Sequence, residues 1–431
     1  MTATDVRSAS QHQSTAYSWY VLLILTGVYT FNWMDRYVLV ILLEPIKLDL
    51  HLSDTQLGVL SGFSFALVYS FAGLPIARWA DRGTRRSIIA VGLLVWSSMT
   101  TLSGLAVNVM QLTAARFGVA LGESACTPPA SSLLSDYFSQ HRRATAFALY
   151  GLGVSLGMAL GLLAGGWANE IYGWRAAFMI VGIPGLLLAV LVRFSIAEPA
   201  RGQQEIGSKD IARYSLRETL QILLRRPSFL AYALGLGLCS FSGNAFETWT
   251  PVYLMRLYHM STGAVGTWTG TVEGVGGVLG TLGGGLLADR LGLRDVRWYL
   301  WIPTLSVALM AVCMFVFLHT SGRLMFVFYF ITVVGAGAYL APMIAITQHI
   351  MPVRLRALAT AFMYLLLNLI GPGAGPTVAG FLNDRLAGAY GNEAVRMSLT
   401  LTLGGAVLSI MLFLVAARRL PRDLALAHAV T

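Results

Sequence analysis

One short basic turn occurs twice in this chain, as Ala80-Asp81-Arg82-Gly83-Thr84-Arg85-Arg86 and as Ala288-Asp289-Arg290-Leu291-Gly292-Leu293-Arg294. Each copy follows a long apolar segment and precedes another, and half the chain separates the two copies. A second repeat, Ala-Thr-Ala-Phe, begins at Ala144 and again at Ala359. Soluble repeat proteins have short periods, whereas a period of half the chain among apolar segments is typical of secondary transporters. The sequence therefore predicts two related membrane halves.

The composition is that of an integral membrane protein. Of the 431 residues, 56% are hydrophobic and 12% are charged, with a mean hydropathy of +0.67, whereas soluble proteins carry about 25% charged residues. Because a helix needs about 20 apolar residues to cross a bilayer, we predict an all-α membrane protein whose twelve transmembrane helices form two pseudo-symmetric six-helix bundles. The predicted helices are 19–43, 57–80, 87–107, 109–134, 144–168, 174–196, 229–256, 263–288, 298–319, 324–350, 357–384 and 394–417.

The one long polar stretch between the predicted helices divides the chain. We expect a cytoplasmic tail at 1–18, a first bundle at 19–196, a cytoplasmic linker at 197–228, a second bundle at 229–417 and a tail at 418–431. Within the linker, apolar residues at helical spacing alternate with basic ones from Tyr214 to Leu224. This segment is either an amphipathic helix on the membrane surface or a simple tether.

The basic residues indicate orientation, not nucleic-acid binding. The net charge is +10 and the isoelectric point is 9.7, but the 30 Lys and Arg residues concentrate in alternate loops between the apolar segments. The positive-inside rule then places both termini in the cytoplasm. Three scattered cysteines give neither a disulfide framework nor a metal site. The absence of Asn-x-Ser/Thr and the preference for Arg over Lys fit a bacterial inner membrane.

The repeated turn combines an aspartate at a helix end with several arginines. Such groups make charge-assisted hydrogen bonds across the cytoplasmic face in one conformation and lose them in another. We therefore expect a conformational latch that holds the outward-open state. The alternative is that these arginines only set the topology. The expected latch residues are Asp81, Arg82, Arg85, Arg86, Asp136, Arg142, Asp289, Arg290 and Arg294.

The two turns resemble the loop signature of the major facilitator superfamily, and the resemblance extends over essentially the whole chain. The second copy, Gly285 to Arg294, matches almost fully, whereas the first has Ala77 where Gly is usual and Thr84 after Gly83 where the order is normally reversed. The glycines from Gly151 to Gly166 are similar to the antiporter signature of the superfamily, with Leu162 where Pro is usual. Their spacing gives a flat helix face for close packing. The Gly and Pro residues from Gly371 to Gly380 are expected to bend their helix.

Charged residues deep in two apolar segments of the first half mark a functional site. Charges at membrane depth are costly unless they are paired or hydrated. Helical geometry puts Asn32 and Arg36 on one face and turns Asp35 about 100° away, so we expect Arg36 to contact Glu123 and Asp35 to contact another neighbour. Arg116, Ala120, Glu123 and Thr127 form one polar stripe on the predicted helix 109–134. A purely structural ion pair is the alternative.

The second half has a polar stripe of its own, on the predicted helix 229–256. It contains Ser240, Asn244, Glu247 or Thr248, and Pro251, and Glu273 lies midway along the next predicted helix. If both acids face the interior, this half is net acidic. Candidate apolar walls of the substrate path, each of which is also explained by packing or lipid contact, are Trp33, Phe65, Tyr69, Phe241, Trp249, Tyr339 and Tyr364.

The stretches Asn32-Trp33-Met34-Asp35-Arg36-Tyr37 and Gly122 to Asp136 resemble the Spinster branch of the superfamily, whose animal members move sphingosine-1-phosphate or lysophospholipids. The resemblance implies a proton-coupled transporter of a lipid-like or amphiphilic molecule that acts as a monomer, with Asp35 and Glu123 in proton coupling. The expected substrate-binding residues are Arg36, Asn32, Arg116, Thr127, Asn244, Glu247, Trp249 and Tyr69. If protonation of Glu123 frees Arg36 for an anionic head group, symport results, whereas a carboxylate that holds a substrate ammonium gives antiport.

Other functions stay open at this stage. A general drug or organic-anion exporter is the nearest alternative, and a transporter-shaped membrane sensor is an alternative of another class. An enzyme is not expected, because the histidines are scattered and neither a nucleophile-base pair nor a phosphate-binding Gly-x-x-x-x-Gly-Lys-Ser/Thr loop occurs. The expected partners are a small amphiphilic substrate, protons and the lipid bilayer, with no cofactor, metal or nucleic acid.

Overall fold

The computed structural model describes residues 15–200, 222–223, 226–351 and 355–428, and this part of the chain is helical without strands. The amphipathic segment expected from Tyr214 lies largely outside these residues. Nine stretches of the described chain are long and apolar enough to cross a membrane, and one of them, Leu358–Pro421, contains two of the predicted helices. The twelve predicted ranges fall largely in helical parts of the described chain, so the all-α membrane fold is confirmed. Four of them, 57–80, 109–134, 324–350 and 357–384, are each divided between consecutive helices.

The segments follow the predicted order. Those of the first half are α2 (Thr15–Leu50), α3 (Asp54–Gly58), the π-helix η1 (Val59–Phe63), α4 (Ser64–Arg82), α5 (Arg85–Ser103), α6 (Val109–Glu123), α7 (Thr127–Tyr137), α8 (Gln140–Tyr172) and α9 (Trp174–Ser195). Those of the second half are α11 (Pro227–Tyr258), α12 (Thr262–Gly292), α13 (Trp298–His319), α14 (Arg323–Ala338), α15 (Leu340–Ile350), α16 (Arg356–Asn368), the π-helix η3 (Leu369–Ala374), α17 (Gly375–Tyr390), the 3₁₀-helix η4 (Gly391–Glu393) and α18 (Ala394–His428).

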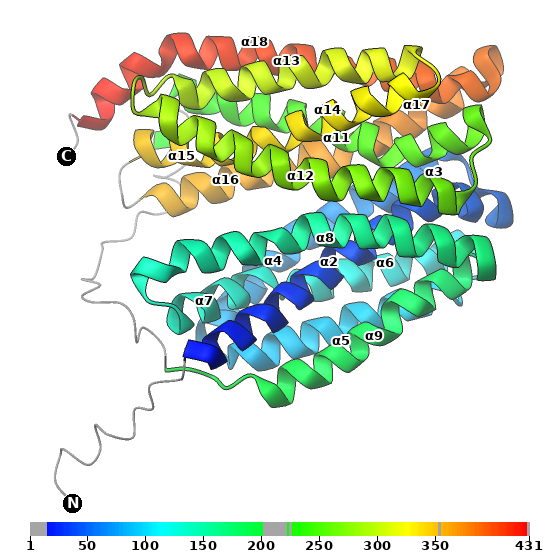
Figure 1. Ribbon diagram of the computed structural model, residues 1–431, viewed down its shortest axis with the longest axis horizontal. Coiled ribbons are helices and arrows are strands. Elements are labelled where there is room, and N and C mark those ends of the chain that lie inside the picture. The colour runs from blue at the N-terminus through cyan, green and yellow to red at the C-terminus, as the bar shows by residue number, and fades with distance from the viewer. Residues whose placement is uncertain (1–14, 201–221, 224–225, 352–354, 429–431) are drawn as a thin grey trace, which may run out of the picture.

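The two halves lie side by side (Figure 1). The helices α2 to α9 gather on one side and α11 to α18 on the other, with the long α8 and α12 running along the boundary. The start of α2 and the end of α18 lie at the same end of the molecule. This end also carries the basic turns after α4 and α12, and we call it the basic-turn end.

Proline interrupts several of the predicted helices. The range 109–134 is two helices, because α6 ends at Glu123 and α7 starts at Thr127 with Pro128 and Pro129 in its first turn. Proline has no N–H and disfavours helical geometry in the residue before it. In the range 357–384, a π-helix that contains Pro372 replaces regular α-helix at the place where a bend is expected. The break after α6 places Glu123 at a helix end inside the fold.

Glycines on α8 allow it to lie directly against the backbone of α2. A Cβ atom on Gly157 would lie 2.4 Å from the carbonyl oxygen of Thr30, and one on Gly161 would lie 2.6 Å from that of Met34. Another face of α8 meets α12, where a Cβ atom on Gly266 would lie 2.3 Å from the carbonyl oxygen of Leu162. The close packing predicted from the glycine spacing is confirmed, and it brings α2 and α12 to opposite sides of one helix.

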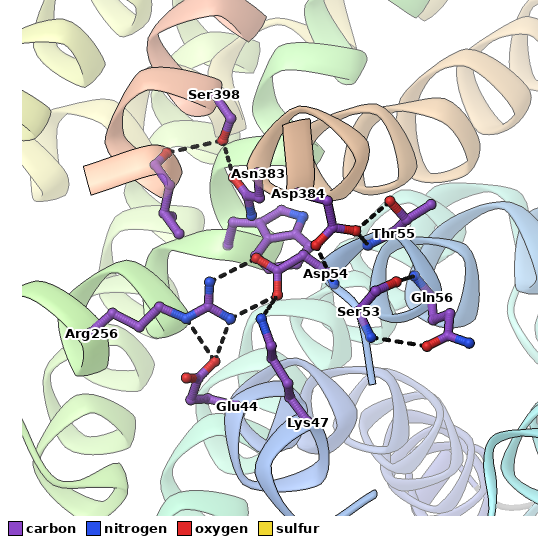
Figure 2. A network of polar contacts seen from close by, with 12 residues as sticks. Glu44, Lys47, Ser53, Asp54, Thr55, Gln56, Arg256, Asn383, Asp384 and Ser398 are labelled. Atoms are coloured by element: carbon purple, nitrogen blue, oxygen red, sulfur yellow. Dashed lines mark hydrogen bonds and ion pairs between the residues drawn. The ribbon is translucent and has the colours of Figure 1, made fainter. Parts of the chain in front are cut away.

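An ionic network, which we call the clasp, joins the two halves at the end opposite to the basic turns (Figure 2). The guanidinium of Arg256 on α11 contacts Glu44 of α2 at 2.6 Å and Asp54 of α3 at 2.7 Å. Lys47 also donates to Asp54. From α17, the carboxylate of Asp384 accepts hydrogen bonds from the backbone N–H of Asp54 at 3.0 Å and from that of Thr55 at 2.7 Å. A carboxylate is favourable at the N-terminus of α3 because it faces unpaired N–H groups.

Substitution of a packed glycine on α8 tests the contact with α2. Gly157→Ala forces the helices apart and is expected to lower the free energy of unfolding by about 1–3 kcal/mol. Gly151→Ala on the same helix is the matched control, because its Cβ atom would meet nothing within 4 Å. Thermal unfolding in detergent measures both variants. Equal midpoints for Gly157→Ala and Gly151→Ala would contradict the packing.

Removal of the clasp arginine tests whether the clasp closes this end of the molecule. Arg256→Gln leaves Glu44 without its cation and Asp54 with Lys47 of its own half as its only cation, so the two halves are expected to separate there. Spin labels on Cys substitutions of the exposed residues Leu48 and Tyr390 measure the separation by electron double resonance, since the three natural cysteines are buried.

Arg396→Gln is the control for loss of charge, because Arg396 pairs with Glu393 at 2.8 Å inside the second half. The distance distribution should lengthen in Arg256→Gln and stay unchanged in Arg396→Gln. An unchanged distribution in Arg256→Gln would show that the clasp does not hold this end closed.

Candidate functional site

A buried ion pair lies inside the first half. The Nε atom of Arg36 on α2 donates to Oε2 of Glu123 at the end of α6, at 2.7 Å. The Glu123 side chain is fully buried, whereas the Arg36 side chain keeps 20% of its surface exposed. The contact of Arg36 with Glu123 that helical spacing predicts is therefore confirmed. Glu123 is enclosed, whereas part of the Arg36 side chain remains exposed.

Asp35 belongs to the same group of charges but has a different partner. Its Oδ2 atom accepts a hydrogen bond from the hydroxyl of Thr100 on α5 at 2.9 Å. The side chain of Asp35 is 1% exposed. Its turn away from the Arg36 face agrees with the prediction, whereas the partner Thr100 was not predicted.

Three aromatic rings surround the guanidinium of Arg36. Its Cζ atom lies 4.6 Å from the centre of the Phe65 ring, 4.9 Å from that of Trp33 and 5.0 Å from that of Tyr69. Rings at these distances attract a cation through their negative faces. Trp33, Phe65 and Tyr69, expected as apolar walls, thus hold a charged group as well.

Several buried polar atoms of this group have no hydrogen-bond partner in the described part of the chain. They are Nδ2 of Asn32, Oδ1 of Asp35, Nε and Nη1 of Arg116, and Oε1 of Glu123. Arg116, on α6, is only 2% exposed, and its Cζ atom lies 5.6 Å from the Phe65 ring. Buried polar groups are normally paired, and each unpaired one costs about 1–3 kcal/mol. Donors and acceptors without partners are what a site for a polar ligand or water requires.

The second half contributes two acids without basic partners. Glu247 on α11 accepts a hydrogen bond from the hydroxyl of Tyr37, which lies on α2 in the first half. Glu273 on α12 is 4% exposed and accepts one from Tyr329 on α14 at 2.7 Å. Within the described residues, neither acid takes part in a salt bridge. The acidic character expected of this half is present, and Tyr37 connects it to the segment that carries Asp35 and Arg36.

Three other residues expected at the site lie differently. Trp249 is fully buried and its indole N–H donates to the carbonyl oxygen of Pro376 at 3.0 Å, so in this structure it packs between α11 and α17. Asn244 is partly buried and donates to the carbonyl oxygen of Ser240 one turn earlier. Thr127 is partly buried at the start of α7, so the proline break after α6 removes it from the continuous stripe predicted with Arg116 and Glu123.

The expected latch residues separate into two groups. Arg85 is 1% exposed and pairs with Asp136 and, at 2.7 Å, with Glu198 at the start of the linker. Arg86 donates through its backbone N–H to Glu198 at 3.0 Å. The exposed members are Arg82, Arg142, Asp289, Arg290 and Arg294. The side chain of Asp81 lies outside the described residues. The contacts of Arg85 thus join α5, α7 and the chain after α9 within the first half.

The sequence does not predict the clasp or the contacts of Thr100, Tyr329 and Glu198. Thr100, Tyr329 and Glu198 are single polar residues without a motif, and their roles depend on partners distant in sequence. A local signal was present at the clasp, because Ser53 and Gln56 form a capping box that starts α3. The pattern Ser-x-x-Gln is typical of a helix start, so it indicates the position of Asp54 but not its contact with Arg256.

Comparisons with known proteins agree with this fold. The model of the Major Facilitator Superfamily matches residues 25–376. An MFS-type efflux pump of Mycolicibacterium smegmatis is 36% identical over 424 residues, which cover 98% of this chain and 97% of that protein. The sphingosine-1-phosphate transporter SPNS2 of Danio rerio is 25% identical over 412 residues, which cover 88% of this chain and 79% of that protein.

A solved structure matches almost the entire fold. It is the crystal structure of a bacterial homologue of the human lysosomal transporter Spinster in an inward-facing, unoccupied conformation. The TM-score is 0.86 and the sequence identity 29%, and the match covers 94% of this chain and 98% of that one. The chain therefore belongs to the Major Facilitator Superfamily of membrane transporters, with Spinster proteins among its relatives.

Proposed function

We propose that the protein is a proton-coupled secondary transporter that moves a lipid-like or amphiphilic organic molecule by alternating access. The observation that carries the proposal is the buried pair of Arg36 and Glu123, surrounded by polar atoms that lack partners. Charged groups at membrane depth mark transport pathways and proton relays. The sphingosine-1-phosphate transporter and the Spinster homologue among the relatives support a lipid-like substrate.

Proton coupling follows from the geometry of the pair. In its charged form, Glu123 accepts a hydrogen bond from Arg36 at 2.7 Å. A proton on Glu123 removes the charge that holds the guanidinium, so Arg36 and the unpaired Arg116 become free to bind an anionic group such as a phosphate. Guanidinium groups suit phosphates because they present several N–H donors in a fixed plane. Proton and substrate then bind together, which is symport.

The second half supports the opposite coupling for a substrate that contains an ammonium group. Glu247 and Glu273 have only tyrosine hydroxyls as partners within the described residues, and a bound ammonium would supply the missing positive charge. Protons then compete with the substrate, and antiport results. A zwitterionic amphiphile would use both halves.

The clasp fits one state of the alternating-access cycle. It joins the halves at the end opposite to the basic turns, and the matched Spinster homologue is in an inward-facing conformation. With the basic-turn end in the cytoplasm of a bacterial cell, as the positive-inside rule indicates, both termini are cytoplasmic. The proposed units are the bundles 19–196 and 229–417 joined by the linker 197–228, in a monomer.

A general exporter of drugs or organic anions is the second candidate. It is favoured by the identity of 36% to the efflux pump along almost the full length of both chains. The two candidates share the Arg36 and Glu123 pair and differ in substrate. Transport of lysolipids and lipid phosphates, compared with that of common drugs in the same vesicles, separates them.

Substitution of Glu123 tests the coupling. Liposomes that contain the protein and a pH-sensitive dye are expected to show proton flux when substrate is added, and Glu123→Gln should abolish it because glutamine does not titrate. Glu393→Gln, at a partly exposed acid that pairs with Arg396 inside the second half, is the control and should transport like the parent protein. Full proton coupling in Glu123→Gln would refute the assignment of this acid.

A second substitution separates substrate binding from folding. Arg116→Gln is expected to raise the apparent KM for an anionic substrate at least about tenfold, since hydrogen bonds to charged groups contribute about 1.5–3 kcal/mol. The unfolding midpoint should change little, because the buried Nε and Nη1 atoms of Arg116 make no hydrogen bond within the described residues and its contact with the Phe65 ring is long, at 5.6 Å.

Arg85→Gln provides the contrast. Arg85 is equally buried but bonded to Asp136, Ser132 and Glu198, so its loss should lower the unfolding midpoint and leave KM unchanged. If Arg116→Gln lowers the midpoint and leaves KM unchanged, Arg116 is structural.

A further inference from the structure

Two adjoining cavities lie on the outer side of the second half at the basic-turn end. The first, of about 220 Å³, is lined by Asp295, Trp298, Trp301 and Leu305 along the start of α13. The second, of about 150 Å³, is lined by Arg297, Trp301, Leu414, Ala417 and Arg418 between α13 and α18. Trp301 belongs to both. We call the combined feature the α13–α18 groove, and it shares no residue with the Arg36 site.

The charge of the groove is positive. Arg297 and Arg418 are exposed, and within the described residues neither takes part in a salt bridge. The one acid, Asp295, is already engaged, because its Oδ1 atom accepts a hydrogen bond from the backbone N–H of Arg297 at 2.8 Å. Two guanidinium groups therefore remain available at the mouth of the groove, and an anion is the ligand they fit.

The surface next to the arginines is apolar. Leu305 is 58% exposed and Trp301 39% exposed, and Leu414 lies one helical turn before Arg418 on α18. Tryptophans concentrate at the level of lipid headgroups, where one side of the ring is apolar and the other is wet. The groove thus combines basic groups, interfacial tryptophans and aliphatic side chains in the order in which a phospholipid presents its headgroup and its chains.

We propose that the α13–α18 groove binds an anionic phospholipid of the bilayer. Arg297 and Arg418 hold the phosphate of the headgroup, Trp298 and Trp301 lie at the level of the glycerol, and an acyl chain lies along Leu305 and Leu414. Basic pockets between transmembrane helices on the cytoplasmic side recognise such headgroups. This lipid is a bound component of the transporter and not its cargo, because the groove is separate from the Arg36 site.

Quenching of tryptophan fluorescence tests the proposal. The full-length protein is placed in phosphatidylcholine vesicles to which a second, brominated lipid is added, either phosphatidylglycerol or phosphatidylcholine. The bromine atoms on its acyl chains quench the fluorescence of tryptophans that they contact. At equal mole fraction, brominated phosphatidylglycerol should quench more than brominated phosphatidylcholine. Arg297→Gln with Arg418→Gln should remove this excess, with affinity falling about fivefold for each arginine.

Two further variants make the result specific. The double substitution Trp298→Phe with Trp301→Phe should remove most of the excess because it removes both reporters in the groove. Arg323 is exposed and lies at the start of α14, at the end of the molecule opposite to the basic turns. Arg323→Gln should therefore leave the excess unchanged. Equal quenching by both lipids, an excess that survives the double arginine substitution, or an equal loss in Arg323→Gln would each overturn the proposal. Lipid binding is measured without transport, so the outcome is independent of the proposed function.

Discussion

The buried ion pair of Arg36 and Glu123 is the interaction on which the arrangement of the surrounding rings and helices depends. A charge inside a membrane protein has little water to stabilise it, so it requires a partner or a hydrated path. Glu123 is fully buried and meets one donor of Arg36, while its second oxygen has no partner within the described residues. The three rings near the guanidinium add an attraction that needs no second acid. The pair is therefore held in place while Oε1 of Glu123 still lacks a hydrogen-bond partner, so this oxygen is able to accept a proton or a hydrogen bond from a ligand.

The helices that position this pair depend on small residues and on proline. Gly157 and Gly161 let α2, which carries Arg36, approach α8 at backbone distance. Pro128 and Pro129 end the regular helix so that Glu123 lies at the terminus of α6 and not in the middle of a continuous helix. Both features fix backbones and so fix the side chains at the site. The glycines lie where α8 packs against α2, and the prolines lie next to the charged group at the end of α6.

The sequence predicted features governed by local spacing and missed those governed by distant partners. The contact of Arg36 with Glu123 followed from helical periodicity, because two buried opposite charges at similar depth have few other options. Trp249 was predicted at a substrate path, whereas in this structure it packs against Pro376, and a tryptophan on an apolar helix has the same sequence pattern in both cases. The clasp was missed because Glu44 and Arg256 lie in different halves of the chain, and neither has a motif that indicates the other. Such pairings are determined by how the halves meet, which periodicity does not specify.

Two neighbouring residues of α2, Arg36 and Tyr37, make contacts of different kinds. The contact of Arg36 depends on the protonation of Glu123, whereas the contact of Tyr37 depends on how the two halves lie against each other. Arg36 and Tyr37 are consecutive on α2 and point about 100° apart. Arg36 therefore pairs with Glu123 inside the first half, while Tyr37 donates to Glu247 in the second half. A movement of one half against the other must break the Tyr37 contact and the clasp, but it need not change the Arg36 pair. A proton on Glu123 acts in the reverse way, because it weakens the Arg36 pair first and can then reach the second half through Tyr37 on the same helix. In the proposed cycle, this helix is thus the element in which binding inside one half is converted into a contact between halves, and coupling depends on its rigidity against α8.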